Sequence, residues 1–125
     1  MQILSEIERK ARNNHARIGL GIGKISEKLI RSAEAAREYA DVVLVGNSKD
    51  IKTMGTDLEI IHSTEPSKKL IELLLSGKID GAVRGTLRAT RTLSELKKSL
   101  KITNLYRVAL LETAYGKPFF LAPVG

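Results

Sequence analysis

The residues whose side chains are best suited to chemistry lie in one loop, which follows an apolar segment and precedes a helical pattern. They share the ability to bind an anion through guanidinium, hydroxyl or backbone groups: Arg84, Gly85, Thr86, Arg88, Thr90 and Arg91. An arginine binds two phosphate oxygens at once, and Gly85 leaves room for close approach. The helix start adds free N–H groups and a positive dipole end. The loop therefore predicts an anion site at a helix N-terminus, the alternative being a loop whose arginines only face water.

The charge distribution points to the same stretch of the chain. The sequence carries a formal net charge of +7, and between residues 84 and 107 seven basic side chains accompany Glu95 as the one acidic side chain. A concentrated positive field favours a phosphate, a nucleotide or a nucleic acid as partner, and the alternative is a solvated basic helix face. Aromatic residues make up only 4% of the sequence. Because base stacking needs aromatic side chains, nucleic acid is the less favoured partner.

Helices that alternate with strands must position this loop. Helices are predicted over residues 2–12, 26–39 and 66–76, with a short helical turn over 48–54, and strands over 17–23, 42–45, 58–61, 79–83, 106–111 and 119–122. The spacing Thr92-Leu93-Ser94-Glu95 matches a capping box and predicts that the next helix begins at Thr92. This alternation predicts one α/β domain over residues 1–125, with a mostly parallel sheet flanked by helices. The last two strands would add an antiparallel pair and make the sheet mixed.

Further candidate residues follow the first three strands, because ligands of open α/β sheets bind beyond the carboxyl ends of the strands. They are Gly21, Gly23, Lys24, Asn47, Ser48, Ser63 and Thr64. Before Lys24 the glycine spacing matches neither the P-loop nor the dinucleotide pattern, so packing against the sheet is favoured over phosphate binding there. His15 and His62 each lack a second ligand at metal spacing, so we expect no metal site.

Composition excludes several other classes of protein. The 125 residues include no cysteine, which removes disulfides and thiolate metal sites and is typical of a cytoplasmic protein. The longest apolar run is too short to cross a membrane, so no membrane association is expected. Two isolated histidines give no basis for a Ser-His-acid constellation, so covalent catalysis of that kind is not predicted.

The anion-binding loop also resembles a known family. The residues that carry the likeness are Asp80, Gly81, Val83, Gly85, Thr86, Arg88 and Thr90. They are similar to the glycine/serine loop of the phosphotransacetylase family, the phosphate acetyl- and butyryltransferases. Val83–Thr90 and the later segment Gly116–Pro123 look closer still to a methanogen branch of that family, the methyltransferase-related marker protein 4. The resemblance implies a fold like that of isocitrate and isopropylmalate dehydrogenases, and transfer of an acyl group between coenzyme A and phosphate.

Some features of that family have no counterpart in this sequence. Arg84 stands where the family has a serine beside the loop glycine. The family's second domain, with its catalytic acid and an arginine, would follow Gly125, so the resemblance implies the N-terminal part of a longer protein and assigns no catalytic residue here. It implies coenzyme A, an acyl phosphate or phosphate as ligand, no covalent cofactor, and a second copy or a partner chain that completes the cleft. The alternative from another class is a non-catalytic interaction or assembly domain.

Overall fold

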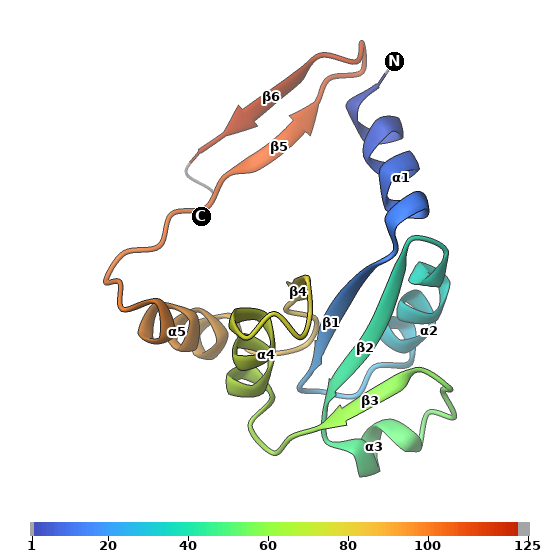
Figure 1. The fold of residues 1–125 in the computed structure, drawn as a ribbon, viewed down its shortest axis with the longest axis vertical. Coiled ribbons are helices and arrows are strands. Elements are labelled where there is room, and N and C mark those ends of the chain that lie inside the picture. The colour runs from blue at the N-terminus through green and yellow to red at the C-terminus, as the bar shows by residue number, and fades with distance from the viewer. Residues whose placement is uncertain (1, 123–125) are drawn as a thin grey trace.

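A parallel sheet forms the centre of the computed structural model, which describes residues 2–122 of the chain (Figure 1). Its four strands are β1 (Ala16–Ile22), β2 (Ala40–Gly46), β3 (Glu59–His62) and β4 (Gly81–Val83), in the order β3-β2-β1-β4. The helices are α1 (Ile3–Asn14), α2 (Glu27–Ala35), α3 (Ser48–Lys52), α4 (Pro66–Leu75) and α5 (Ala89–Leu100), with a 3-10 turn over Ala36–Glu38. The α/β class and the parallel strands are confirmed, whereas likeness to the dehydrogenase fold stays a prediction. Over residues 2–122 no helix is long and apolar enough to cross a membrane.

Strand β2 is buried on both faces from Val42 to Gly46, as the apolar run Val42–Val45 predicts. On one face, Leu20 of β1 lies opposite Leu44 of β2, and both belong to the buried cluster that Ile30 of α2 completes. On the other face, Val43 packs with Leu70 of α4. Two apolar layers therefore hold the sheet between α2 and α3 on one side and α4 on the other.

The chain reverses its progress across the sheet after β3. From β1 it proceeds outward to β2 and β3, and α4 then carries it back to place β4 on the other side of β1. The connection after β1 leads into α2, which covers one face of the sheet. Leu87, in the connection after β4, packs in the core on the opposite face, which α4 covers. In open α/β sheets a crevice for ligands forms where two such connections diverge, at the carboxyl edge of the strands.

Helix α5 begins three residues earlier than the capping-box spacing predicts. It starts at Ala89, with Arg88 as its N-cap residue. Thr92 is buried inside the helix, where its hydroxyl donates to the Arg88 carbonyl oxygen at 2.9 Å and lies 3.1 Å from the Ser67 hydroxyl of α4. The predicted start at Thr92 is wrong, because this hydroxyl bonds back to the preceding turn and packs against α4 instead of capping a helix.

The last two strands do not join the main sheet. β5 (Ala109–Glu112) and β6 (Pro118–Leu121) pair with each other as a separate antiparallel sheet, so the prediction of one mixed sheet is wrong. The physical reason lies after α5: its C-cap residue Lys101 is left-handed, with φ 56°, and the chain then leads away from β4 toward α1 (Figure 1). There the Ile3 N–H donates to the Glu112 carboxylate at 2.6 Å. Pro123, the last residue of the segment likened to the methanogen branch, lies outside the described residues.

Charges at the amino edge of the main sheet are paired. The Arg17 guanidinium contacts both carboxylate oxygens of Glu59 at 2.9 Å and reaches Asp41 at 3.4 Å. Hydrogen bonds from Arg17 lower the pKa of the Glu59 carboxyl below its ordinary value. Arg37 and Asp57 form a second pair at this edge, 2.8 Å apart. Because acidic partners compensate these arginines, the excess positive charge of the sequence lies elsewhere.

Candidate anion-binding site

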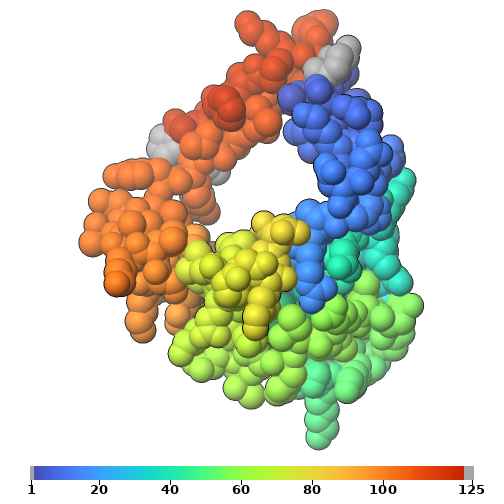
Figure 2. Space-filling view, in the orientation of Figure 1, coloured from blue at the N-terminus to red at the C-terminus, as the bar shows by residue number. Residues whose placement is uncertain are grey.

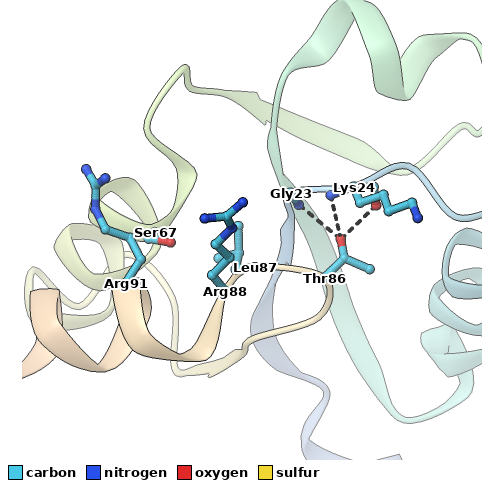
Figure 3. A pocket seen from close by; sticks show the side chains of 7 residues that line it. All are labelled: Gly23, Lys24, Ser67, Thr86, Leu87, Arg88 and Arg91. Carbon is cyan, nitrogen blue, oxygen red and sulfur yellow. Dashed lines mark hydrogen bonds between the residues drawn. The ribbon is translucent and has the colours of Figure 1, made fainter.

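An open cleft of about 510 Å³ lies at the carboxyl edge of the sheet, between the connections that follow β1 and β4 (Figure 3). The residues that line it are Gly23, Lys24, Ser67, Thr86, Leu87, Arg88 and Arg91. All except Ser67 and Leu87 are residues that the sequence predicts for the site. Three of the lining side chains are cationic and none of those described is acidic. A recess lined by one sign of charge focuses the electric field and favours an anion.

The hydroxyl of Thr86 joins the two connections. Its oxygen accepts hydrogen bonds from the N–H groups of Gly23 at 3.0 Å and Lys24 at 3.1 Å, and it donates to the Lys24 carbonyl oxygen at 2.8 Å (Figure 3). The Thr86 N–H donates in turn to the Gly21 carbonyl oxygen at 3.2 Å. Since these groups already bind one another, Thr86 positions the walls of the cleft.

Glycines let the two connections approach this closely. Gly85 has φ +61°, in the left-handed region that favours glycine, and a Cβ at this position would collide with the Gly21 carbonyl oxygen. A Cβ at Gly21 would collide with the buried side chain of Leu87. The close approach that Gly85 predicts is therefore made here by the protein itself, and Gly23 lines the cleft.

Arg88 and Lys24 carry the uncompensated charge of the cleft. Arg91, in the first turn of α5, contacts Glu65 at 3.4 Å and Glu95 at 3.6 Å, so acidic groups partly offset its charge. Within residues 2–122, neither Arg88 nor Lys24 forms an ion pair. Figure 3 shows the guanidinium groups of Arg88 and Arg91 extending toward the same side, with Lys24 beyond Thr86.

The N-terminus of α5 adds to the positive region. Arg88 is the N-cap residue, and no side chain caps the helix. The first amide of α5 bonded within the helix is that of Thr92, which donates to the Arg88 carbonyl oxygen at 3.0 Å. The N–H groups of Ala89, Thr90 and Arg91 therefore have no acceptor inside the helix and give its start a partial positive charge.

Three of the predicted loop residues do not line this cleft: Gly85, whose place is in the turn beneath it, Arg84 and Thr90. The Arg84 guanidinium donates to the Leu87 carbonyl oxygen at 2.6 Å and lines a neighbouring groove of about 300 Å³, together with Arg107. Thr90 is exposed on α5 and does not line the cleft with its side chain. Ligand binding by the side chains of Arg84 and Thr90 stays a prediction.

Asn47 and Ser48 lie farther along the same edge, after β2. The Asn47 side chain accepts from the Lys49 N–H at 3.0 Å and caps the short helix α3. The Ser48 N–H donates to Nδ1 of His62 at 3.0 Å, and the Ser48 hydroxyl lies 3.1 Å from the same nitrogen. From the sequence His62 is expected to be isolated. In the structure, the parallel pairing of β2 with β3 places it next to Ser48. In the described part of the chain, no three His, Cys, Asp or Glu side chains could together hold a metal ion.

Ser67 is a lining residue that sequence reasoning misses. It lies directly after Pro66 in the first turn of α4, is buried, and contacts Thr92 of α5. A proline at the first helical position marks a helix start, and this signal could have placed Ser67 at the same edge of the sheet. Two predicted candidates precede Ser67. Thr64 lines an adjoining recess of about 210 Å³. The Ser63 hydroxyl accepts a hydrogen bond from the Glu65 N–H at 3.0 Å.

Replacing Thr86 with valine should loosen the two connections with little change in side-chain volume. The substitution removes the acceptor of the Gly23 and Lys24 N–H groups, and we expect the free energy of unfolding to fall by about 1–2 kcal/mol. Urea denaturation followed by circular dichroism measures this change. Thr86→Ser keeps the hydroxyl and should lose much less. An unfolding midpoint for Thr86→Val equal to that of the wild type would show that the hydroxyl does not hold the cleft walls together.

No family model matches the chain. Among curated proteins it is similar to the "Putative methyltransferase mtx subunit X" of Methanosarcina mazei, with 50% identity over 125 residues that cover 98% of this chain and 45% of the relative. The protein of the same name from Methanosarcina acetivorans has the same identity and the same coverage. An uncharacterized methyltransferase of Methanocaldococcus jannaschii is 30% identical over 107 residues, which cover 85% of this chain and 36% of that relative.

These relatives bear on the family that the anion-binding loop resembles. The chain spans about 45% of the length of the two Methanosarcina relatives. All three relatives come from methanogens and are named methyltransferases or methyltransferase subunits, which supports the archaeal, methyltransferase-related branch expected from Val83–Thr90. They give no support to the phosphotransacetylase family, so acyl transfer and phosphate binding stay predictions.

Proposed function

We propose that this chain is the anion-binding portion of a methyltransferase-related transferase, and that its cleft takes a phosphate-bearing small molecule such as coenzyme A, an acyl phosphate or phosphate itself. The observation that carries the proposal is the arrangement of positive charge at the carboxyl edge of the sheet. Arg88, the N-cap residue of the uncapped helix α5, and Lys24 both line the cleft, and neither has an ion-pair partner within residues 2–122.

The chemistry of these groups favours phosphate over other anions. A guanidinium presents two parallel N–H donors that match two phosphate oxygens, so Arg88 can hold one face of the group. Lys24 adds a compact charge, and the free N–H groups of α5 give fixed donors along the helix axis. A cleft of about 510 Å³ has room for more than inorganic phosphate and falls within the size range of small-molecule sites. These features support a ligand that carries phosphate on a larger body.

The transferase part of the proposal rests on the relatives. The two Methanosarcina proteins are named as subunits of a methyltransferase, and they are more than twice as long as the matched region. We assign ligand binding to this chain and no catalytic acid or base to its described residues. The complete reaction would then need polypeptide beyond these residues to provide such groups.

Removing the Arg88 side chain tests the ligand proposal. We expect Arg88→Ala to weaken binding of coenzyme A and of inorganic phosphate about tenfold or more, because a charge-assisted hydrogen-bond pair is lost. Isothermal titration calorimetry of the purified chain measures both affinities. Lys52→Ala is the matched control, since Lys52 is an exposed cation on α3 outside the cleft. Equal affinities for Arg88→Ala and the wild type would contradict the proposal.

Titration with a short DNA duplex separates a shaped site from a generic basic surface. Binding to nucleic acid falls steeply with salt, because it depends on the release of counterions. Coenzyme A binding that persists at moderate salt supports the cleft as a specific site. Duplex binding that collapses with salt, without coenzyme A binding, would make the segment between residues 84 and 107 a basic surface and would overturn the proposed ligand.

A further inference from the structure

The outer edge of β4 is unpaired. β4 pairs with β1 on its inner side, with Leu20 opposite Val83, and within residues 2–122 no strand pairs with its outer side. The Asp80 N–H points inward and donates to the Arg17 carbonyl oxygen at 2.7 Å. The carbonyl groups of Arg17 and Gly21 face β4, so in this register the N–H groups of Gly81 and Val83 face β1, and the N–H and C=O groups of Ala82 face outward. This edge therefore offers backbone hydrogen-bonding groups to another strand.

The two outer edges of the sheet differ in their side chains. β3 begins at Glu59 and ends at His62, so polar groups flank the edge that faces water. β4 consists of glycine, alanine and valine only, and Val83 is 49% exposed. Edge strands that remain in water are usually protected by charged residues, whereas interior strands of parallel sheets are wholly apolar. By composition β4 is typical of an interior strand.

An apolar hollow continues this edge. A recess of about 210 Å³ lies between β4, β1 and α2, and its apolar lining includes Ile18, Leu20, Leu29, Ala33 and Val83. Figure 2 shows a wide opening through the molecule at this level, bounded by β4, the blue region of α1 and β1, and the orange and red region of α5 and the hairpin. Leu4 of α1 and Val108 before β5 are 52% and 59% exposed. An apolar recess that is open beside a free strand edge is typical of an interaction site.

We infer that the free edge of β4 and the hollow beside it bind an apolar β-strand of a second polypeptide, one equivalent to the part of the Methanosarcina relatives that this chain does not match. Those relatives share 50% identity with this chain, which implies the same sheet, and more than half of their length lies outside the match. The order β3-β2-β1-β4 matches the first four strands of the doubly wound order 3-2-1-4-5-6, in which further strands continue beyond the fourth. Pairing with β4 would satisfy the outward backbone groups of Ala82 and cover Val83 at the same time.

Co-expression tests this interface. The chain, carrying an affinity tag, is produced together with the unmatched part of the Methanosarcina mazei protein, and the purified complex is examined by light scattering and hydrogen exchange. We expect a one-to-one complex in which the amide of Ala82 gains protection. Val83→Lys should weaken the complex at least tenfold, because it places a charge on the covered edge. Leu75→Lys is the matched control, since Leu75 is 48% exposed at the end of α4 and does not line the hollow, and it should change affinity less than twofold.

Three results would overturn the inference. One is the absence of a complex with the co-expressed polypeptide. Another is a complex that Val83→Lys and Leu75→Lys weaken equally and that leaves the Ala82 amide unprotected. The third is a dimer of the chain alone that Val83→Lys dissociates, which would assign the edge to a second copy. Circular dichroism verifies that Val83→Lys is folded. The hydrogen-exchange measurement is made on the wild-type complex, so it tests the interface even if that variant does not fold. All of these outcomes are independent of coenzyme A binding, so they are distinguishable from failure of the proposed ligand.

Discussion

Gly85→Ala is expected to lower the free energy of unfolding by about 3 kcal/mol, through backbone strain combined with a steric clash. Gly85 has φ +61°, and its new Cβ would meet the Gly21 carbonyl oxygen, which accepts the Thr86 N–H. Relief of the clash requires the connection after β4 to move away from β1. Urea denaturation measures the loss of stability, and titration with coenzyme A should show weaker binding in the same variant.

Gly55→Ala separates strain from collision. Gly55 also has a left-handed backbone, with φ +67°, but a Cβ there would meet nothing within 4 Å. This control should cost only the conformational strain, about 1 kcal/mol. If Gly85→Ala and Gly55→Ala lose the same amount of stability, the close approach of the two connections is not what makes glycine necessary at position 85.

Leu44→Ala is expected to lower the free energy of unfolding by about 3 kcal/mol, because it removes a fully buried side chain and leaves a cavity. Leu44 is in the middle of β2, has no exposed surface, and lies between Leu20 and Ile60 on the neighbouring strands. A rigid sheet with helices on both faces cannot collapse easily around the missing atoms. The midpoint of urea denaturation should fall without a change in the slope of the transition.

Leu100→Ala is the control for the loss of a leucine side chain as such. Leu100 is 44% exposed at the end of α5, so little buried surface is lost there, and we expect a change below about 1 kcal/mol. Comparable losses at the two positions would mean that the cluster around Leu44 does not form the main core of this protein.

Local patterns were sufficient to predict the main sheet and most of its helices. The wholly apolar run from Val42 to Val45 indicates a strand covered on both faces, and the structure places it at the centre of the core. Ser26 caps α2 through the Leu29 N–H, and Pro66 begins α4, as the sequence predicts. These signals depend on neighbouring residues alone, which is why they can be recognised without knowledge of the tertiary fold.

The incorrect predictions concern features that depend on distant contacts. Thr92 fits a capping box by spacing, but packing between α4 and α5 draws it into the helix interior. The hairpin has the alternation of a strand pair, and no local pattern reveals whether it joins the main sheet or lies beside α1.

The candidate site shows the same division. Glycine, threonine and arginine types predicted a loop suited to anions, and the cleft contains Thr86, Arg88 and Arg91 from it. Arg84 has the same chemistry and lies in the next groove, because its guanidinium bonds to the Leu87 carbonyl oxygen. Which arginine lies in the cleft depends on the path of the backbone through Gly85, and side-chain chemistry does not encode that path.

The contact between Lys24 and Thr86 has a consequence for how the protein folds. The two residues are 62 positions apart in the sequence, whereas β1 pairs with β2 across a separation of 24, as in Ile18 with Val42. Closing the longer loop costs more chain entropy, so the pairing of β1 with β2 can precede the arrival of β4. The cleft that Lys24 and Arg88 both line is therefore complete only when the whole chain has folded. An anion that binds both will select the native state by mass action and raise its population over partly folded chains.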